Sequence, residues 1–328
     1  MKKLFTSREA LLCILILIMT LSVGAIADDF LSIGNLLSIY NDTSILIILA
    51  LGQMLVIITR CIDLSVAANL ALTGMVIAMI NSSFPDFAVP LLVLFGALLG
   101  LCMGMINGLL VWKLGIPAIV VTLGTMSIYR GLIFLLSDGA WVNAHEMSKM
   151  FMQIPRSTFI GIALLSWVSI ITVAVFYYFI RYARTGREIY AAGNSPTAAF
   201  YTGIDVGRSQ FIAFSLSGLL AGLCGYLWVS RYAVAYVDVA AGFELQVISA
   251  CVIGGISIMG GVGTVTGCVL GALFLGVINN ALPVIGVSPF WQMAISGGVI
   301  VLAVIASSKA EKKSGRIILK SAGLAPSK

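Results

Sequence analysis

Long, nearly uninterrupted apolar runs constrain this chain more than any other feature of its sequence. A helix needs about 20 mostly apolar residues to cross the hydrocarbon core of a bilayer, and such runs recur along the 328 residues. Only 10% of the residues are charged, against about 25% in soluble domains. A water-soluble globule with this composition could not cover its surface with polar groups. The sequence therefore predicts an integral membrane protein.

The runs predict an all-α fold with about ten transmembrane helices. A β-barrel is excluded because its strands are short and alternate in polarity. The eighth run is short and contains Gly254 and Gly255, which leaves open whether it is continuous, broken or re-entrant. The predicted spans cover roughly residues 9–27, 44–60, 64–81, 88–111, 116–136, 158–181, 208–229, 245–259, 264–282 and 290–307.

Lysines and arginines set the orientation of the spans, because basic loops stay in the cytoplasm. With a cytoplasmic N-terminus, only Arg130, Lys149, Arg156 and Arg231 of the 19 basic residues fall on the outer side. We therefore expect a cytoplasmic segment 1–8, a membrane domain 9–307 and a cytoplasmic basic tail 308–328. A cleavable signal peptide ending near Ala25-Ile26-Ala27 is the competing interpretation, and it would leave nine spans.

Two pairs of similar segments indicate an internal repeat. Ile62-Asp63-Leu64-Ser65 resembles Val237-Asp238-Val239-Ala240, and Ile106-Asn107-Gly108-Leu109-Leu110 resembles Ile278-Asn279-Asn280-Ala281-Leu282, at offsets near half the chain. The corresponding spans run in opposite directions, as expected for two pseudo-symmetric inverted halves with a substrate path between them. Chance similarity between apolar strings is the alternative.

Motifs for chemistry are missing from the sequence. There is no G-x-x-x-x-G-K-[ST] phosphate-binding loop and no H-E-x-x-H or intramembrane protease pattern, so we predict a protein that is not an enzyme, with no metal site or cofactor of its own. Ion-coupled carriers use acidic or histidine residues deep in the membrane, and here Asp63 and Glu244 lie near span ends. An ion-coupled carrier of a small polar solute remains the alternative to a transporter energised by another chain.

The longest inner loop, residues 182–207, contains a predicted short helix. Asn194 or Ser195 is a suitable N-cap, and Pro196 then takes the first helical position. A capped helix in a cytoplasmic loop presents a surface to a partner outside the membrane. A solvated basic loop that only enforces orientation is the competing interpretation.

The chain resembles the ribose/xylose/arabinose-type permeases of bacterial ATP-binding-cassette (ABC) sugar importers, the branch that includes the rhamnose and autoinducer-2 permeases. The resemblance covers about residues 45–307. It rests on Ile62-Asp63-Leu64-Ser65-Val66, Asn107-Gly108-Leu109-Leu110, Ile116-Pro117-Ala118, Thr122-Leu123-Gly124-Thr125-Met126, Arg130-Gly131, Gly254-Gly255, Gly260-Gly261-Val262-Gly263 and Asn279-Asn280.

The resemblance implies a permease subunit of the bacterial inner membrane that works by alternating access. Its implied partners are ABC ATPase subunits that bind ATP and Mg²⁺, a second permease copy or paralogue, a periplasmic sugar-binding protein and membrane lipid. Nucleic acid is not expected, because the basic residues lie at segment ends. The implied ATPase-coupling residues are Gly186, Arg187, Gly193, Asn194, Ser195, Pro196, Thr197, Ala198, Ala199 and Gly203. Arg60-Cys61 stands where the family usually has a glycine pair.

Polar residues inside spans are the predicted lining of the substrate path, because buried polar groups need a cavity or a neighbouring helix. Hydrogen bonding between helices is the competing role for each. Arg130 could also anchor to lipid head groups. Asp238 and Glu244 are our hypothesis for the binding-protein docking surface. The predicted path residues are Asn69, Asn107, Thr122, Thr125, Asn279 and Asn280.

Overall fold

The computed structural model describes residues 8–288, 290–292, 294–295, 297–298 and 301. Most of this part is helical. Its helices are α1 (Arg8–Gly24), α2 (Ile33–Ile58), α3 (Val66–Ser83), α4 (Val89–Leu114), α5 (Ala118–Ser137), α6 (Lys149–Gln153), α7 (Leu164–Tyr182), α8 (Arg184–Asn194), α9 (Pro196–Tyr201), α10 (Val206–Tyr232), α11 (Phe243–Ile253) and α12 (Val265–Val284), with 3-10 turns η1 (Asp28–Leu31) and η2 (Ile154–Arg156).

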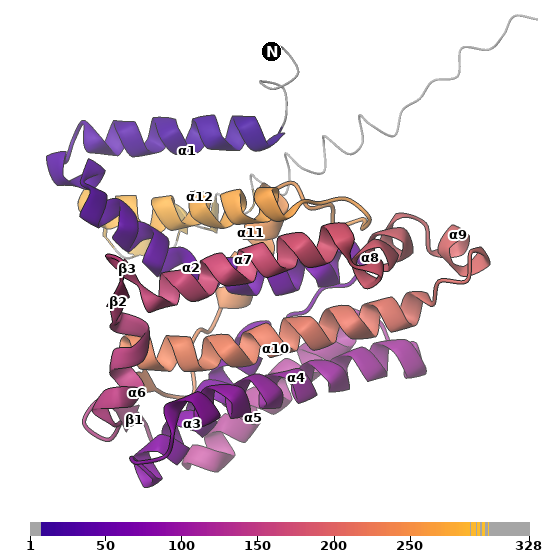
Figure 1. The fold of residues 1–328 in the computed structure, drawn as a ribbon, viewed down its shortest axis with the longest axis horizontal. Helices are drawn as coiled ribbons and strands as arrows, with labels where there is room; N and C mark the ends of the chain where they lie inside the picture. The colour runs from indigo at the N-terminus through magenta and orange to yellow at the C-terminus, as the bar shows by residue number, and fades with distance from the viewer. Residues whose placement is uncertain (1–7, 289, 293, 296, 299–300, 302–328) are drawn as a thin grey trace, which may run out of the picture.

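The long helices lie side by side, and the short elements gather at the two ends of the bundle (Figure 1). At one end, here called the β end, β1 (Val142–Asn143) pairs antiparallel with β4 (Val234–Ala235). β2 (Thr158–Phe159) and β3 (Ile162–Ala163) form a hairpin nearby. At the opposite end, here called the α9 end, α8 lies at the end of α7, and α9 projects beyond the long helices (Figure 1).

Seven helices in the described ranges are long and apolar enough to cross a membrane: α2, α3, α4, α5, α7, α10 and α12. They match seven predicted spans, and the prediction of an all-α membrane protein is confirmed. The first and eighth predicted spans correspond to α1 and α11, which have only 17 and 11 residues. The tenth, 290–307, falls mostly outside the described residues.

Several predicted boundaries were wrong. The second span begins at Ile33 rather than near 44, because the Ser32 hydroxyl accepts the Asn35 N–H at 3.2 Å and caps the helix earlier. The sixth begins at Leu164, since the preceding residues turn back as the β2–β3 hairpin. The eighth ends at Ile253, where the glycine pair that follows breaks the helix. Gly255 has φ +85°, a conformation that favours glycine.

Close glycine contacts join α4 to α10. A Cβ atom at Gly104 would lie 2.9 Å from Gly218 Cα, and one at Gly222 would lie 3.0 Å from Gly100 Cα. Small residues let the backbones of membrane helices approach in this way, and packing replaces the hydrophobic driving force that lipid cannot supply. α4 and α10 are therefore closely packed along this face.

The remaining contacts place α2 and α10 at the centre of the bundle. α2 is buried along most of its length, and it packs against α10, α11 and α12. α10 packs in turn against α2, α3 and α4. α3 contacts α4, and α11 contacts α12. The more peripheral α5 and α7 are mostly unburied in this chain, as expected for apolar helices that face lipid or another subunit.

Candidate functional site

The predicted coupling segment forms two consecutive helices at the α9 end. Ser195 is the N-cap of α9, and its hydroxyl accepts the Ala198 N–H at 3.3 Å. Pro196 occupies the first helical position. The predicted capped helix is confirmed, with Ser195 rather than Asn194 as the cap, because Asn194 is the last residue of α8. Gly203 follows α9 with φ +82° and so allows the chain to turn back toward α10.

The tip of α9 presents two aromatic side chains to the surroundings. Phe200 is 72% exposed and Tyr201 is 82% exposed, and their rings lie 5.9 Å apart between centroids. Ala199, one residue earlier, is buried. Large exposed aromatic groups outside a membrane span mark interaction surfaces. The sequence did not single out this pair, although two adjacent aromatics in a cytoplasmic loop could have done so.

The other helix of the segment, α8, is fixed to the bundle. Ile189 is fully buried, and the Tyr190 hydroxyl donates to the Gly263 carbonyl at 2.7 Å. Burial raises the pKa of Tyr190 to about 12, so its hydroxyl remains a donor at neutral pH. Gly186 packs closely against the last turns of α7 at Phe179 and Ile180. Movement of α8 would therefore be passed directly to the membrane helices.

Arg60 connects this segment to the core, and sequence reasoning missed it as a site residue. Its Nε donates to the Gly193 carbonyl at 2.6 Å, and its NH2 group donates to the Asn194 carbonyl at 2.9 Å. Arg60 has φ +65°, which is uncommon for a residue other than glycine. The side chain thus caps the carboxyl end of α8, where a cation is favourable.

A cavity of about 540 Å³ opens beside Arg60 at the α9 end. Gln210 of α10, Pro117 from the α4–α5 connection and Ile258 from the loop after α11 line it. The cavity thus brings together residues from the first half of the chain, such as Pro117, and from the second half, such as Gln210. Its polar and apolar lining is suited to a passage for a small solute.

A buried polar chain lies further into the bundle. Asp63 is 2% exposed, and its carboxylate accepts from the Ser65 N–H at 2.9 Å and from the Ser65 hydroxyl at 2.6 Å. Asn107 Nδ2 donates to the Ser65 hydroxyl oxygen at 2.8 Å. The Gln53 amide, in its hydrogen-bonded orientation, pairs with the Asp63 backbone at 3.2 Å. This chain links α2, the α2–α3 connection and α4.

Four predicted path residues gather around this chain. Asn69 Nδ2 donates to the Gly100 carbonyl at 3.1 Å, and the Thr122 hydroxyl donates to the Ala118 carbonyl at 2.9 Å. The Thr125 hydroxyl points to the Thr122 carbonyl at 3.4 Å. Among the residues that the structure describes, the side-chain oxygens of Asn69 and Asn107 are buried without a hydrogen-bond partner. Because an unpaired buried acceptor costs about 1–3 kcal/mol, these two groups favour a role beyond helix packing.

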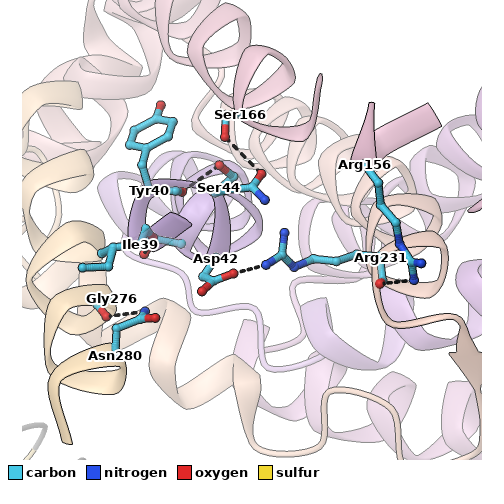
Figure 2. Close-up of polar contacts among 11 residues, drawn as sticks. Ile39, Tyr40, Asp42, Ser44, Arg156, Ser166, Arg231, Gly276 and Asn280 are labelled. Atoms are coloured by element: carbon cyan, nitrogen blue, oxygen red, sulfur yellow. Dashed lines mark hydrogen bonds and ion pairs between the residues drawn. The ribbon is translucent and has the colours of Figure 1, made fainter. Parts of the chain in front are cut away.

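Asn279 and Asn280 lie elsewhere, so the predicted path residues do not form one site. Both line a separate cavity of about 310 Å³ at the β end, between α2, α10, α11 and α12. In Figure 2, Asp42 of α2 and Arg231 of α10 point toward each other near Asn280 and form an ion pair. Asn280 Nδ2 also donates to the Gly276 carbonyl at 2.9 Å.

The acidic pair proposed for docking is also at the β end. Asp238 is exposed and Glu244 is half-buried, and both interact electrostatically with Arg130. The Arg130 guanidinium donates to the Val237 and Val239 carbonyls, each at 2.7 Å. Arg130 therefore fixes the loop before α11. These contacts favour this role over anchoring to lipid head groups.

Potential metal ligands do not cluster among the described residues. Within the described ranges, no three His, Cys, Asp or Glu side chains lie close enough to hold a metal ion. The site is therefore one of hydrogen-bonding groups, cavities and a projecting helix. Such a site can bind and pass a polar solute and can contact a partner.

Comparison with known proteins gives one consistent result. The family model described as branched-chain amino acid transport system / permease component matches residues 35–304. The autoinducer 2 import system permease protein LsrC of Photorhabdus luminescens is 36% identical over 93% of this chain and 91% of its own length. The ribose import permease protein RbsC of Haemophilus influenzae is 36% identical over 90% of this chain and 91% of its own length. No solved structure matches the chain.

Proposed function

Because the chain belongs to the family of branched-chain amino acid transport system permease components, we propose that it is the membrane-spanning subunit of an ATP-driven, binding-protein-dependent importer of a monosaccharide. The substrate class follows from relatives that are named for autoinducer 2 and for ribose. The family resemblance inferred from the sequence is thus confirmed. We extend the import function for which these relatives are named to this chain.

The α8–α9 segment, with α8 fixed to the bundle and α9 projecting from it (Figure 1), is the observation that carries the proposal. An ATP-driven transporter subunit without its own ATP site must receive motion from another chain. α9 offers an exposed Phe200–Tyr201 tip, while α8 is tied to the bundle through Arg60 and Tyr190. A partner that moves α9 would therefore also move the ends of α2 and α12. The predicted coupling residues, from Gly186 to Gly203, belong to this one rigid connection.

The assembly proposed around the chain has three other kinds of protein. ATPase subunits, which bind ATP and Mg²⁺, dock on the α9 end, and a periplasmic binding protein docks on the β end near Asp238 and Glu244. A second permease, either a copy or a paralogue, completes the membrane part. The α9 end then faces the cytoplasm together with both termini, and the bundle lies in the bacterial inner membrane with lipid around it.

The two halves of the bundle support the proposed inverted repeat. The contacts of α10 with α3 and α4 correspond to the contacts of α2 with α11 and α12. The pairing of α3 with α4 likewise corresponds to the pairing of α11 with α12. We propose that α2–α3–α4 and α10–α11–α12 are the related units of a ten-span bundle, with 290–307 as its last span.

Alternating access would expose the path first at the β end and then at the α9 end. ATP can drive this change only if the ATPases bind the two conformations with different affinities. Asn279 and Asn280 would meet the solute at the outer cavity. Asn69, Asn107, Thr122 and Thr125 would contribute hydrogen bonds deeper in the path. Few strong contacts are expected, since tight binding would slow release.

The proposal is tested by replacing the exposed aromatic tip. The double variant Phe200→Ser/Tyr201→Ser should abolish co-purification of the ATPase in mild detergent and ATP-dependent sugar uptake. Folding should be retained because both rings are exposed. Phe84→Ser is the matched control, since Phe84 is 64% exposed but lies at the β end of α3. If no ATPase accompanies the native chain, and uptake instead collapses with an ion gradient, the chain is an ion-coupled carrier.

A further inference from the structure

The cavity at the β end has the mixed lining of a site for a polar, ring-shaped ligand. On one side lie the aromatic rings of Trp228 and Phe243, whose centroids are 5.1 Å apart in an edge-to-face arrangement. On another side lie Asp42, Arg231 and Gln246. Small-molecule sites combine apolar and aromatic walls with a few polar groups that fix orientation.

Two polar groups of this lining form no hydrogen bond with the described part of the chain. Within the part of the chain that the structure describes, neither the Gln246 amide nor Trp228 Nε1 forms a hydrogen bond, and both residues are half-buried. The amide can donate and accept, and the indole can donate. A ligand with several hydroxyl groups would satisfy both, whereas an apolar ligand would leave them unpaired.

The charges of the cavity favour a neutral ligand. Asp42 and Arg231 form an ion pair across α2 and α10, so their charges cancel (Figure 2). Arg156 donates to the Arg231 carbonyl at 2.6 Å, which ties the end of α10 to the η2 turn. An anion such as a phosphate head group would need an uncompensated positive charge, and this site does not offer one. Sugar hydroxyls can instead share the carboxylate as acceptor and the guanidinium as donor.

The size of the cavity sets the size of the ligand. Its volume of about 310 Å³ is at the small end of the range of about 300–1,000 Å³ for small-molecule sites. A single sugar ring fits this space, and an oligosaccharide does not. All of the residues that line the cavity belong to this polypeptide, and none of them belongs to the buried hydrogen-bond network around Asp63.

We infer that this cavity is a binding site for one neutral monosaccharide. The sugar would occupy it at the outer end of the permease before it reaches the Asp63 region. The inference rests on the proposed function for the choice of an outer end and of sugars as probes. The aromatic rings would cover the apolar face of the sugar ring. Gln246, Trp228 Nε1 and the Asp42–Arg231 pair would hold its hydroxyl groups.

The test is equilibrium dialysis of the purified permease, without ATPase or binding protein, against radiolabelled D-ribose, D-xylose, L-arabinose and L-rhamnose. We expect saturable binding of at least one sugar. Gln246→Ala and Trp228→Phe should each weaken this binding about tenfold or more. Trp167→Phe is the matched control and should leave it unchanged, because Trp167 Nε1 already donates to the Phe159 carbonyl at 3.0 Å and lies outside the cavity lining.

Each outcome decides the inference. Gln246→Ala removes an unpaired group, and Trp228→Phe keeps an aromatic ring, so both variants should remain folded; gel filtration and thermal melting check this. Absence of binding for all four sugars, or binding that both variants retain, would overturn the inference. Either result would leave the proposed function intact if the ATPase still co-purifies with the chain. If the chain binds sugar but no ATPase co-purifies with it, the inference stands and the proposed ATP-driven import is contradicted.

Discussion

Arg60 and Gly193 are joined by a hydrogen bond from the Arg60 Nε to the Gly193 carbonyl oxygen at 2.6 Å. One residue follows the end of α2 closely, and the other lies in the last turn of α8. The bond holds Arg60, whose φ of +65° lies in the left-handed region, just after the carboxyl end of α2. Backbone strain of this kind costs about 1–3 kcal/mol, and it persists only where the surrounding contacts hold it in place.

Arg60→Gly is expected to separate folding from coupling. Glycine adopts a φ of +65° readily, so the fold should be kept, while the two contacts to the end of α8 are lost. Sugar uptake per ATP hydrolysed should fall severalfold in proteoliposomes that contain the full importer. Arg208→Ala, which removes an exposed arginine at the start of α10, is the control. Unchanged coupling in Arg60→Gly would show that Arg60 serves the fold alone.

Gly104→Ala should destabilise the bundle, because a Cβ atom there would meet the α10 backbone at Gly218. Overpacking typically costs about 1–3 kcal/mol, and the melting temperature in detergent should fall accordingly. Gly131→Ala is the matched control. No atom lies within 4 Å of a Cβ at Gly131, and alanine favours a helix over glycine by about 1 kcal/mol. Equal melting temperatures for both variants would contradict the close α4–α10 packing.

Ser65→Ala should disturb the buried polar chain at both of its bonds. It removes a donor to the Asp63 carboxylate and the acceptor for Asn107 Nδ2. Leaving buried groups unpaired costs about 1–3 kcal/mol, which thermal unfolding in detergent would measure. The double variant Ser65→Ala/Asn107→Leu should lose less than the sum of the single variants, since neighbours in one network are coupled. Simple additivity would argue against that network.

Tyr190→Phe should loosen α8 while keeping its packing. Loss of the hydrogen bond to the Gly263 carbonyl is expected to cost about 0.5–1.5 kcal/mol. The folded pKa of about 12 lies above the unfolded value of about 10. The contribution of this group is therefore complete below pH 10 and is lost as the pH rises toward 12. Thermal melting should show the same difference from the native chain at pH 6 and pH 8; a difference that changes between them would contradict this assignment.

The apolar runs of the sequence predicted the membrane-spanning α-fold, because helix length and hydropathy are local properties that the bilayer selects directly. The capped helix at Pro196 was predictable for the same reason, since a cap and a first-position proline act within one turn. The motifs around Asp63 and Asn107 were sufficient to indicate the permease family. These features depend on residues that are close together in the chain.

Tertiary structure alone decided which distant residues meet. It joined Arg60 to the end of α8 and separated Asn279 and Asn280 from the other predicted path residues. Polarity and period within a segment do not encode these outcomes. They follow from backbone approach at glycines and from hydrogen bonds between segments more than 100 residues apart.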